Sequence, residues 1–184
     1  MKRIRLVASL MFAVTLCLGG LAGCGPSAAD LIREDITSEF DEIKASQDDL
    51  LDEIAAASGE DFTALGIDAK EFAASYLEGF DYQIDDIKVE DTTADVQVTV
   101  TLKSISDILS SFQTAYVEKL QTLDLATLAD EQGLYTLAGQ TLMEMVESAK
   151  PVENTFTITY EKDEDGVWST TEDAETAITN AFLS

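Results

Sequence analysis

Apolar residues recur at helical spacing in the segment that follows residue 27. Ser27, with Asp30 three residues later, is typical of a helix start in which Asp replaces the Glu of a capping box. Acidic residues occupy the opposite face, so Ser58-Gly59 is expected to end one long amphipathic helix. Its apolar positions are Ile32, Ile36, Phe40, Ile43, Leu50, Ile54 and Ala57.

A second helix is predicted shortly afterwards. Phe62, Leu65 and Ile67 indicate a short helical turn that is interrupted at Gly66. The following Asp68-Ala69-Lys70-Glu71 is a capping box and opens a helix that ends at Gly79.

The apolar period then changes from 3.6 residues to 2, which predicts strands. The clearest strand alternates Ala94, Val96, Val98, Val100 and Leu102 with polar residues, as a half-buried strand does. In the preceding strand the parity changes at Asp85-Asp86, which predicts a β-bulge. Glu90-Asp91-Thr92-Thr93 supplies the turn of the hairpin.

The succession of two helices and a strand hairpin is then predicted a second time. Ser104 or Ser106 can cap a third helix, and a fourth follows Gly133 and stops before Pro151. Residues 156–160 alternate as a strand, Val167-Trp168 is its hairpin partner, and residues 173–182 form a last short helix. The order ααββααββα predicts a single α+β domain over residues 28–184, with about four antiparallel strands in two hairpins packed under helices.

The N-terminus has the pattern of a secretory signal. Three basic residues precede an uncharged run from Leu6 to Leu21, which is short for a spanning helix. Leu21-Ala22-Gly23-Cys24 resembles the lipobox of bacterial lipoproteins. The resemblance implies removal of residues 1–23, a diacylglyceryl group on Cys24, and attachment to the extracytoplasmic face of the cell membrane. The alternative is an uncleaved membrane helix in which the Cys occurs by chance.

Residues 24–27 would then be the lipidated Cys and a short tether. Two acyl chains hold a protein stably on a membrane, because each buried methylene contributes about 0.8 kcal/mol. The tether spans only about 3.3 to 3.6 Å per residue when extended, so the domain is expected close to the membrane.

Charge excludes several kinds of partner. Loss of the three basic residues of the signal leaves 8 basic and 36 acidic residues, a formal charge of −28. Nucleic acid is therefore excluded, because binding to phosphate needs Lys or Arg. The acid runs Asp41-Glu42, Asp48-Asp49 and Asp52-Glu53 are interpreted as a solvated helix face, with an acidic patch for a basic partner as the alternative.

Residue types exclude several kinds of chemistry. The chain has no His, and the only Cys in the mature part is Cys24. Ser-His-Asp and Cys-His catalysis and zinc sites built on His and Cys are therefore excluded. No cofactor is predicted, with one alternative that involves calcium.

That alternative rests on residues 161–172. Glu161, Asp163, Asp165, Gly166 and Glu172 follow the spacing of an EF-hand calcium loop. Position 1 is Glu instead of Asp, and a strand stands where the incoming helix of an EF-hand would be. A solvated hairpin turn, which Asp-Glu-Asp-Gly strongly favours, is the simpler interpretation.

Four stretches of the chain carry a family resemblance: Leu65-Gly66-Ile67-Asp68, Gly79-Phe80-Asp81-Tyr82-Gln83-Ile84, residues 94–100 and Gly166-Val167-Trp168. They resemble stretches of Gram-positive surface lipoproteins with NTF2-like or cystatin-like domains of unknown function. The resemblance implies a curved antiparallel sheet wrapped by helices, often as a cone with a pocket. It brings no catalytic residues with it.

The resemblance raises an enzymatic alternative. Enzymes of the NTF2-like type can use Asp with Tyr in an apolar cone for proton transfer, as isomerases and dehydratases do. Tyr82, Tyr116, Tyr160 and Asp86 could meet in such a pocket, although these tyrosines also occupy ordinary core positions. The first hypothesis is therefore a non-enzymatic lipoprotein that binds a small apolar ligand or a protein partner beside the membrane.

Overall fold

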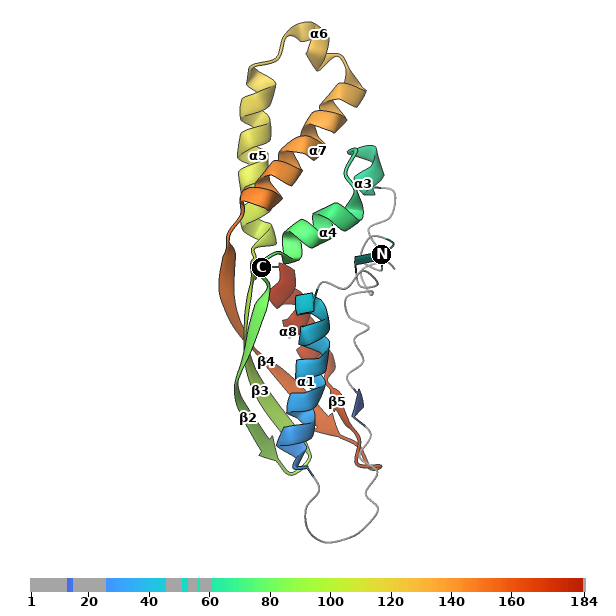
Figure 1. The fold of residues 1–184 in the computed structure, drawn as a ribbon, viewed down its shortest axis with the longest axis vertical. Coiled ribbons are helices and arrows are strands. Elements are labelled where there is room, and N and C mark those ends of the chain that lie inside the picture. Colours follow the sequence, from blue (N-terminus) through green and yellow to red (C-terminus); the bar gives the residue numbers. More distant parts are fainter. Residues whose placement is uncertain (1–12, 15–25, 46–50, 53–55, 57–60, 184) are drawn as a thin grey trace. The chain divides into compact units, whose positions relative to one another are not determined.

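The chain folds into two compact units, each assembled from separate stretches of sequence (Figure 1). The computed structural model describes residues 13–14, 26–45, 51–52, 56 and 61–183. The first unit contains residues 1–45, 81–101 and 153–182, and the second contains residues 46–80, 102–152 and 183–184. The segment predicted as a single domain thus divides into two units.

An antiparallel sheet is the centre of the first unit. Its strands are β1 (Ala13–Val14), β2 (Asp81–Glu90), β3 (Thr93–Lys103), β4 (Pro151–Lys162) and β5 (Trp168–Thr170). They lie in the order β1-β5-β4-β3-β2, and the pairs β1–β5, β2–β3 and β4–β5 are antiparallel. The α+β class and the two predicted hairpins are confirmed.

The alternation predicted for β3 is confirmed. Ala94, Val96, Val98, Val100 and Leu102 are all buried, and the residues between them face outward. The outward face is polar: Thr99 Oγ1 lies 2.8 Å from Thr155 Oγ1, and Thr159 donates to Asp95 at 2.8 Å. One face of the sheet therefore packs into the core and the other faces solvent, as the two-residue alternation of apolar and polar side chains requires.

The predicted irregularities of the first hairpin also occur. The β2–β3 register shifts between Ile84 and Asp86, which is the predicted bulge. Asp91, in the turn, has a φ of 47°, a left-handed conformation that Asp tolerates better than most residues.

Helices α1 (Ala28–Ala45) and α8 (Glu172–Leu183) belong to the unit that contains the sheet. Ser27 and Asp30 bond to each other through backbone and side chain, which confirms the predicted start of α1. Ile32, Ile36, Phe40 and Ile43 are buried, and α1 contacts β2. Leu50, Ile54 and Ala57 lie outside the described residues, so the second half of the predicted helix stays a prediction.

The second unit is helical. The predicted caps of α4 and α5 are confirmed: Asp68 accepts from the N–H groups of Lys70 and Glu71, and Ser104 accepts from Asp107. We call α5, α6 and α7 the helical hairpin, because α5 and α7 lie side by side and α6 joins them (Figure 1). The elements are α3 (Asp61–Ala64), α4 (Ala69–Leu77), α5 (Ile105–Gln121), α6 (Leu125–Leu128) and α7 (Glu131–Ser148).

This arrangement differs from the prediction that the helices cover the sheet. Of the helices in the described part of the chain, α1 and α8 belong to the unit that holds most of the sheet, whereas α4 and α5 both pack on α7. Gly139 of α7 permits the connection between α3 and α4 to pack closely against this helix, because a Cβ at this position would collide with the carbonyl oxygen of Leu65.

A buried lysine joins the C-terminal turns of two helices in the second unit. The side chain of Lys103 is 2% exposed. Its Nζ donates to the carbonyl oxygens of Ser75 at 2.7 Å and Val146 at 3.0 Å, and lies 3.2 Å from Glu78 Oε2. Ser75 and Val146 lie in the last turns of α4 and α7, where carbonyl oxygens lack helical partners and a positive charge is stabilising.

Candidate functional site

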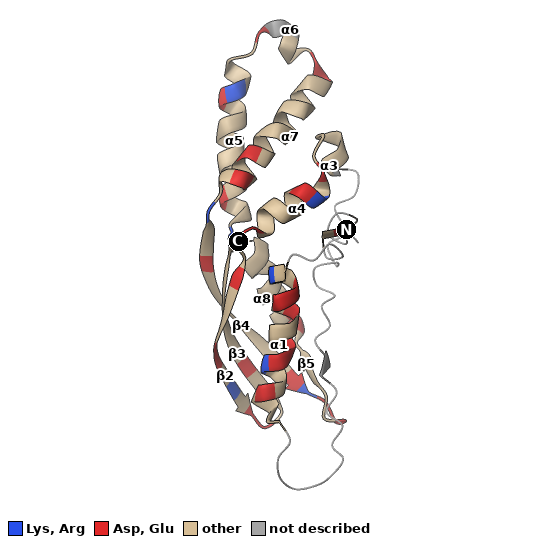
Figure 2. Cartoon of the chain, in the orientation of Figure 1, with Lys and Arg blue, Asp and Glu red and all other residues tan. Residues whose placement is uncertain are grey.

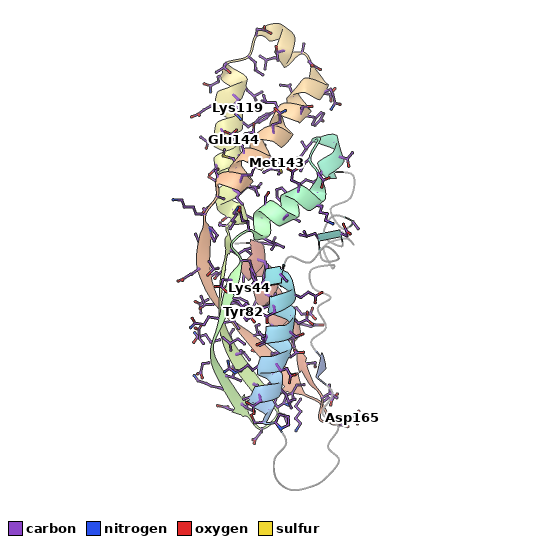
Figure 3. The ribbon with its side chains drawn as sticks, in the orientation of Figure 1. Lys44, Tyr82, Lys119, Met143, Glu144 and Asp165 are labelled. Atoms are coloured by element: carbon purple, nitrogen blue, oxygen red, sulfur yellow. The ribbon has the colours of Figure 1, made fainter. Side chains whose placement is uncertain are left out.

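Two tyrosines of the sheet donate hydrogen bonds to carboxylates of α1. Tyr160 of β4 donates to Asp35 Oδ2 at 3.1 Å, and Tyr82 of β2 donates to Asp41 Oδ1 at 2.8 Å. Beside the second pair, Lys44 forms an ion pair with Asp81 at 2.7 Å and lies 6.0 Å from the centre of the Tyr82 ring (Figure 3). These contacts hold α1 against β4, which lies inside the sheet, and against β2, which forms its edge.

Burial shifts the pKa of both members of the Asp35–Tyr160 pair. Burial raises the pKa of the Asp35 carboxyl, although the hydrogen bond from Tyr160 opposes this shift. Burial also raises the pKa of Glu39, one helical turn further along α1, and the charges of Asp35 and Glu42 raise it further. The pKa of the Tyr160 phenol is raised by burial and by the Asp35 carboxylate, so this phenol stays protonated.

Packing leaves little room for a substrate around this pair. The side chains of Ile36, Ile158, Tyr160 and Trp168 are at most 1% exposed. Phe40, also buried, makes an edge-on contact with Tyr82 at 5.1 Å between ring centres. The Tyr160 hydroxyl is thus enclosed by core side chains and satisfied by Asp35, which is the arrangement of a structural tie.

Each of the four residues considered for proton transfer has surroundings of its own. The hydroxyls of Tyr82 and Tyr160 have the separate partners given above, and Tyr116 of the second unit donates to the carbonyl oxygen of Leu134 at 3.2 Å. Asp86 lies exposed at the bulge, 3.7 Å from Lys88. The enzymatic alternative therefore stays a prediction.

The predicted calcium loop folds as a hairpin turn. Asp163 Oδ1 accepts from the backbone N–H groups of Asp165 at 3.0 Å and Val167 at 2.8 Å, and Gly166 has a φ of 86°. Glu161 lies on β4 and Glu172 opens α8. Within the described residues, no three carboxylate, Cys or His side chains are grouped so that they could hold a metal ion. The geometry is that of an Asp-stabilised turn.

A groove of about 450 Å³ lies on the helical hairpin, lined by the α5–α6 connection, α6 and α7. Asp130 is the only charged residue among those that line it. We call it the hairpin groove, and its lining residues are Leu123, Thr127, Asp130, Gln132, Gly133, Leu134, Thr136, Leu137 and Gln140. Apart from Asp130, the residues that line the groove are uncharged, whereas the chain as a whole is strongly acidic.

Apolar side chains outside the groove are exposed on the same helical hairpin. Leu109 is 52% exposed, Val117 46%, Leu128 39% and Tyr135 46%. Ile108 is the only buried residue of α5, although this helix carries an apolar stripe. Most of α5 and the first half of α7 are tan in Figure 2, the colour of residues other than Lys, Arg, Asp and Glu. This agrees with the uncharged runs 108–117 and 132–143 of the sequence.

The sequence interpretation missed this surface. It predicted a helix after Ser104 without indicating how much of its apolar surface is exposed, whereas Leu109 and Val117 are exposed in the structure. A signal was present in the uncharged runs 108–117 and 132–143, which are unusual in a chain of formal charge −25. Charge depletion on an otherwise acidic surface is a feature of interface cores.

Known proteins provide little information about the family of this chain. No protein-family model matches the chain, and no curated protein matches it. One solved structure, the ycdA protein of Bacillus subtilis subsp. subtilis str. 168, whose assignment as a lipoprotein is provisional, shares 15% identity with a TM-score of 0.47. The match covers 87% of this chain and 52% of that one, so the chain spans about half its length. At this TM-score and identity the likeness establishes neither a common fold nor a common function.

The predicted membrane anchor lies in a part of the chain that the structure does not describe. Cys24 and the rest of Leu21-Ala22-Gly23-Cys24 are outside the described residues. None of the helices in the described part combines the length and the apolar character needed to cross a membrane.

Proposed function

We propose that this protein is an extracytoplasmic lipoprotein, anchored through a diacylglyceryl group on Cys24, that acts as a non-enzymatic binding module. The lipobox-like Leu21-Ala22-Gly23-Cys24 supports the anchor. Close packing around the Asp35–Tyr160 pair supports a structural role for the sheet unit. The observation that carries the binding role is the hairpin groove, in which Asp130 is the only charged lining residue, with exposed apolar residues beside it.

The proposed occupant of the hairpin groove is the apolar face of a helix from a protein partner. A small ligand is usually enclosed over 70–90% of its surface, whereas this groove lies open on the hairpin surface. Exposed Leu128 and Tyr135 flank it and would extend the contact beyond the groove itself. An amphipathic helix offers apolar side chains at matching intervals of three and four residues.

A matched pair of threonines tests this proposal. Thr136 lines the groove and Thr114 does not, but both are exposed on the helical hairpin and donate to the carbonyl oxygen four residues earlier. A photo-crosslinking residue at position 136 should form one discrete protein adduct in intact cells, and the same residue at position 114 should form none. Thr136→Glu should abolish the adduct formed from a crosslinker at Gln140, whereas Thr114→Glu should leave it unchanged.

Melting temperatures provide the control for folding. Both substitutions are on exposed positions, so each should change stability by no more than about 0.5 kcal/mol. Identical crosslinking from positions 114 and 136 would contradict a docking role for the groove. Saturable binding of the neutral dye Nile red, lost in Thr136→Glu without any protein adduct, would instead indicate a small apolar ligand.

A further inference from the structure

The edge of β5 that faces away from β4 has backbone groups that point out of the β2–β5 part of the sheet. Val167 accepts from the N–H of Asp163 at 2.9 Å, and the N–H of Thr171 donates to Thr159 at 3.0 Å. Both residues therefore direct their backbone groups at β4. Hydrogen-bonding direction alternates along an antiparallel strand, so Trp168 and Thr170 direct their N–H and C=O groups to the opposite, outer edge.

That outer edge is where β1 pairs. Ala13 is opposite Ser169 and Val14 is opposite Trp168, in antiparallel register. Ala13 and Val14 belong to the uncharged run from Leu6 to Leu21, which the proposed function assigns to the cleaved signal. Processing before Cys24 would remove β1 and leave the outward groups of Trp168 and Thr170 without their strand partner.

We propose that the β5 edge of the processed chain accepts an extended, uncharged segment of another protein as an added antiparallel strand. This proposal rests on the proposed function in one respect, the removal of residues 1–23. The pairing with Ala13 and Val14 shows what fits this edge: an extended backbone from a stretch of sequence that carries no charge. Strand addition of this kind draws affinity from main-chain hydrogen bonds and specificity from alternate side chains.

Charge argues against a second copy of this chain that pairs through β2. That strand forms the other edge of the sheet and carries Asp81, Asp85, Asp86 and Glu90, with a bulge in its middle. The β5 edge adjoins the turn that contains Asp163, Glu164 and Asp165. Like charges facing each other across a strand pair are destabilising, so an uncharged strand from another protein is the better occupant.

Amide hydrogen exchange at single residues tests the proposal within one strand. The probe is a synthetic peptide of residues 10–17 with Cys17→Ser, added to the processed lipoprotein in detergent. Amides of Trp168 and Thr170 should exchange at least about tenfold more slowly with the peptide, while the amide of Ser169, which faces β4, should not change. The single tryptophan of the chain, Trp168, gives an independent fluorescence signal of the same event.

Two substitutions separate strand pairing from apolar adhesion. Val14→Pro in the peptide removes the N–H that would bond to Trp168 but keeps the peptide apolar, and should abolish the slower exchange. Thr170→Pro in the protein removes an outward N–H without loss of a bond to β4, and should weaken peptide binding at least tenfold with little change in melting temperature. A Cys24→Ala chain that keeps its signal should show slow exchange without added peptide.

Each contrary result has a defined meaning. Unchanged exchange at Trp168 and Thr170 with millimolar peptide would overturn the proposal. So would a dimeric mass for the processed protein together with slow exchange at both amides, because a second copy would then occupy the edge. Intact mass reports cleavage and acylation separately: an uncleaved chain contradicts the lipoprotein assignment, whereas a cleaved, acylated chain with unchanged exchange contradicts the strand-accepting edge.

Discussion

At the scale of single residues, Lys103 shows how one buried charge can hold helix ends together. Its ammonium group donates to carbonyl oxygens in the last turns of α4 and α7. Lys103→Met would keep most of the volume but leave both oxygens without this donor. We expect it to lower the free energy of unfolding by about 2 kcal/mol or more, measured by urea denaturation. Lys88→Met, at a side chain that is 75% exposed, should change it by less than about 0.5 kcal/mol.

Asp35 allows a second prediction at this scale, on pH dependence. Burial raises its pKa above the ordinary value of 3.8, so the folded chain holds this proton more tightly than the unfolded chain. The resulting stability is fully present below pH 3.8 and is lost as the pH rises through the folded-state pKa. Asp35→Asn should remove this loss, so the variant should gain stability relative to the native chain as the pH rises from 3.8 toward neutrality.

Asp30 provides the control with the opposite sign. Hydrogen bonds from Ser27 lower its pKa, so its contribution to stability is present above pH 3.8 and is lost at lower pH. Asp30→Asn should therefore lose stability relative to the native chain over the same rise in pH. Thermal unfolding from pH 3 to 8 measures both differences, and parallel curves for the two variants would contradict the assignment for Asp35.

At the scale of elements, the turn between β4 and β5 depends on one carboxylate. Asp163 accepts hydrogen bonds from two backbone N–H groups, whereas the Asp165 side chain accepts none within the described turn. Asp163→Ala should lower the free energy of unfolding by about 1 kcal/mol, and Asp165→Ala by less than about 0.5 kcal/mol. Because Asp163 is already engaged, millimolar calcium should change neither Trp168 fluorescence nor the melting temperature; a saturable response would restore the calcium hypothesis.

Most of the individual elements could be predicted, because their signals are local. Alternation at Val96, Val98 and Val100, the bulge at Asp85-Asp86 and the caps at Asp68 and Ser104 all depend on residues within a few positions. The exposure of Leu109 and Val117 could not be predicted, because an apolar stripe does not show how much of it a neighbour covers. The same holds for Asp35, which sits beside the Ile32 and Ile36 stripe and meets Tyr160 only through tertiary folding.

At the scale of the whole molecule, the division into two units could not be predicted from local pattern. Each unit collects stretches that lie far apart in sequence, such as residues 1–45 with 153–182. No linker composition marks the boundaries, since they fall near Phe80 and within β3 and β4. The α+β class holds at this scale, and a specific NTF2-like or cystatin-like relationship stays a prediction.

The anchor is the remaining prediction for the whole molecule, since it decides where both units act. If Cys24 is acylated, Cys24→Ala should abolish incorporation of labelled palmitate and leave a chain that keeps residues 1–23, heavier by the mass of the uncleaved signal. Cys17→Ala, in the same apolar run but preceded by Leu16, should leave labelling and cleavage unchanged. Extraction of the membranes distinguishes an anchor of acyl chains from an uncleaved membrane helix. Two acyl chains hold the processed chain on the membrane without any spanning helix. Continued acyl labelling of the Cys24→Ala chain would contradict the lipoprotein assignment, and with it the opening of the β5 edge on processing.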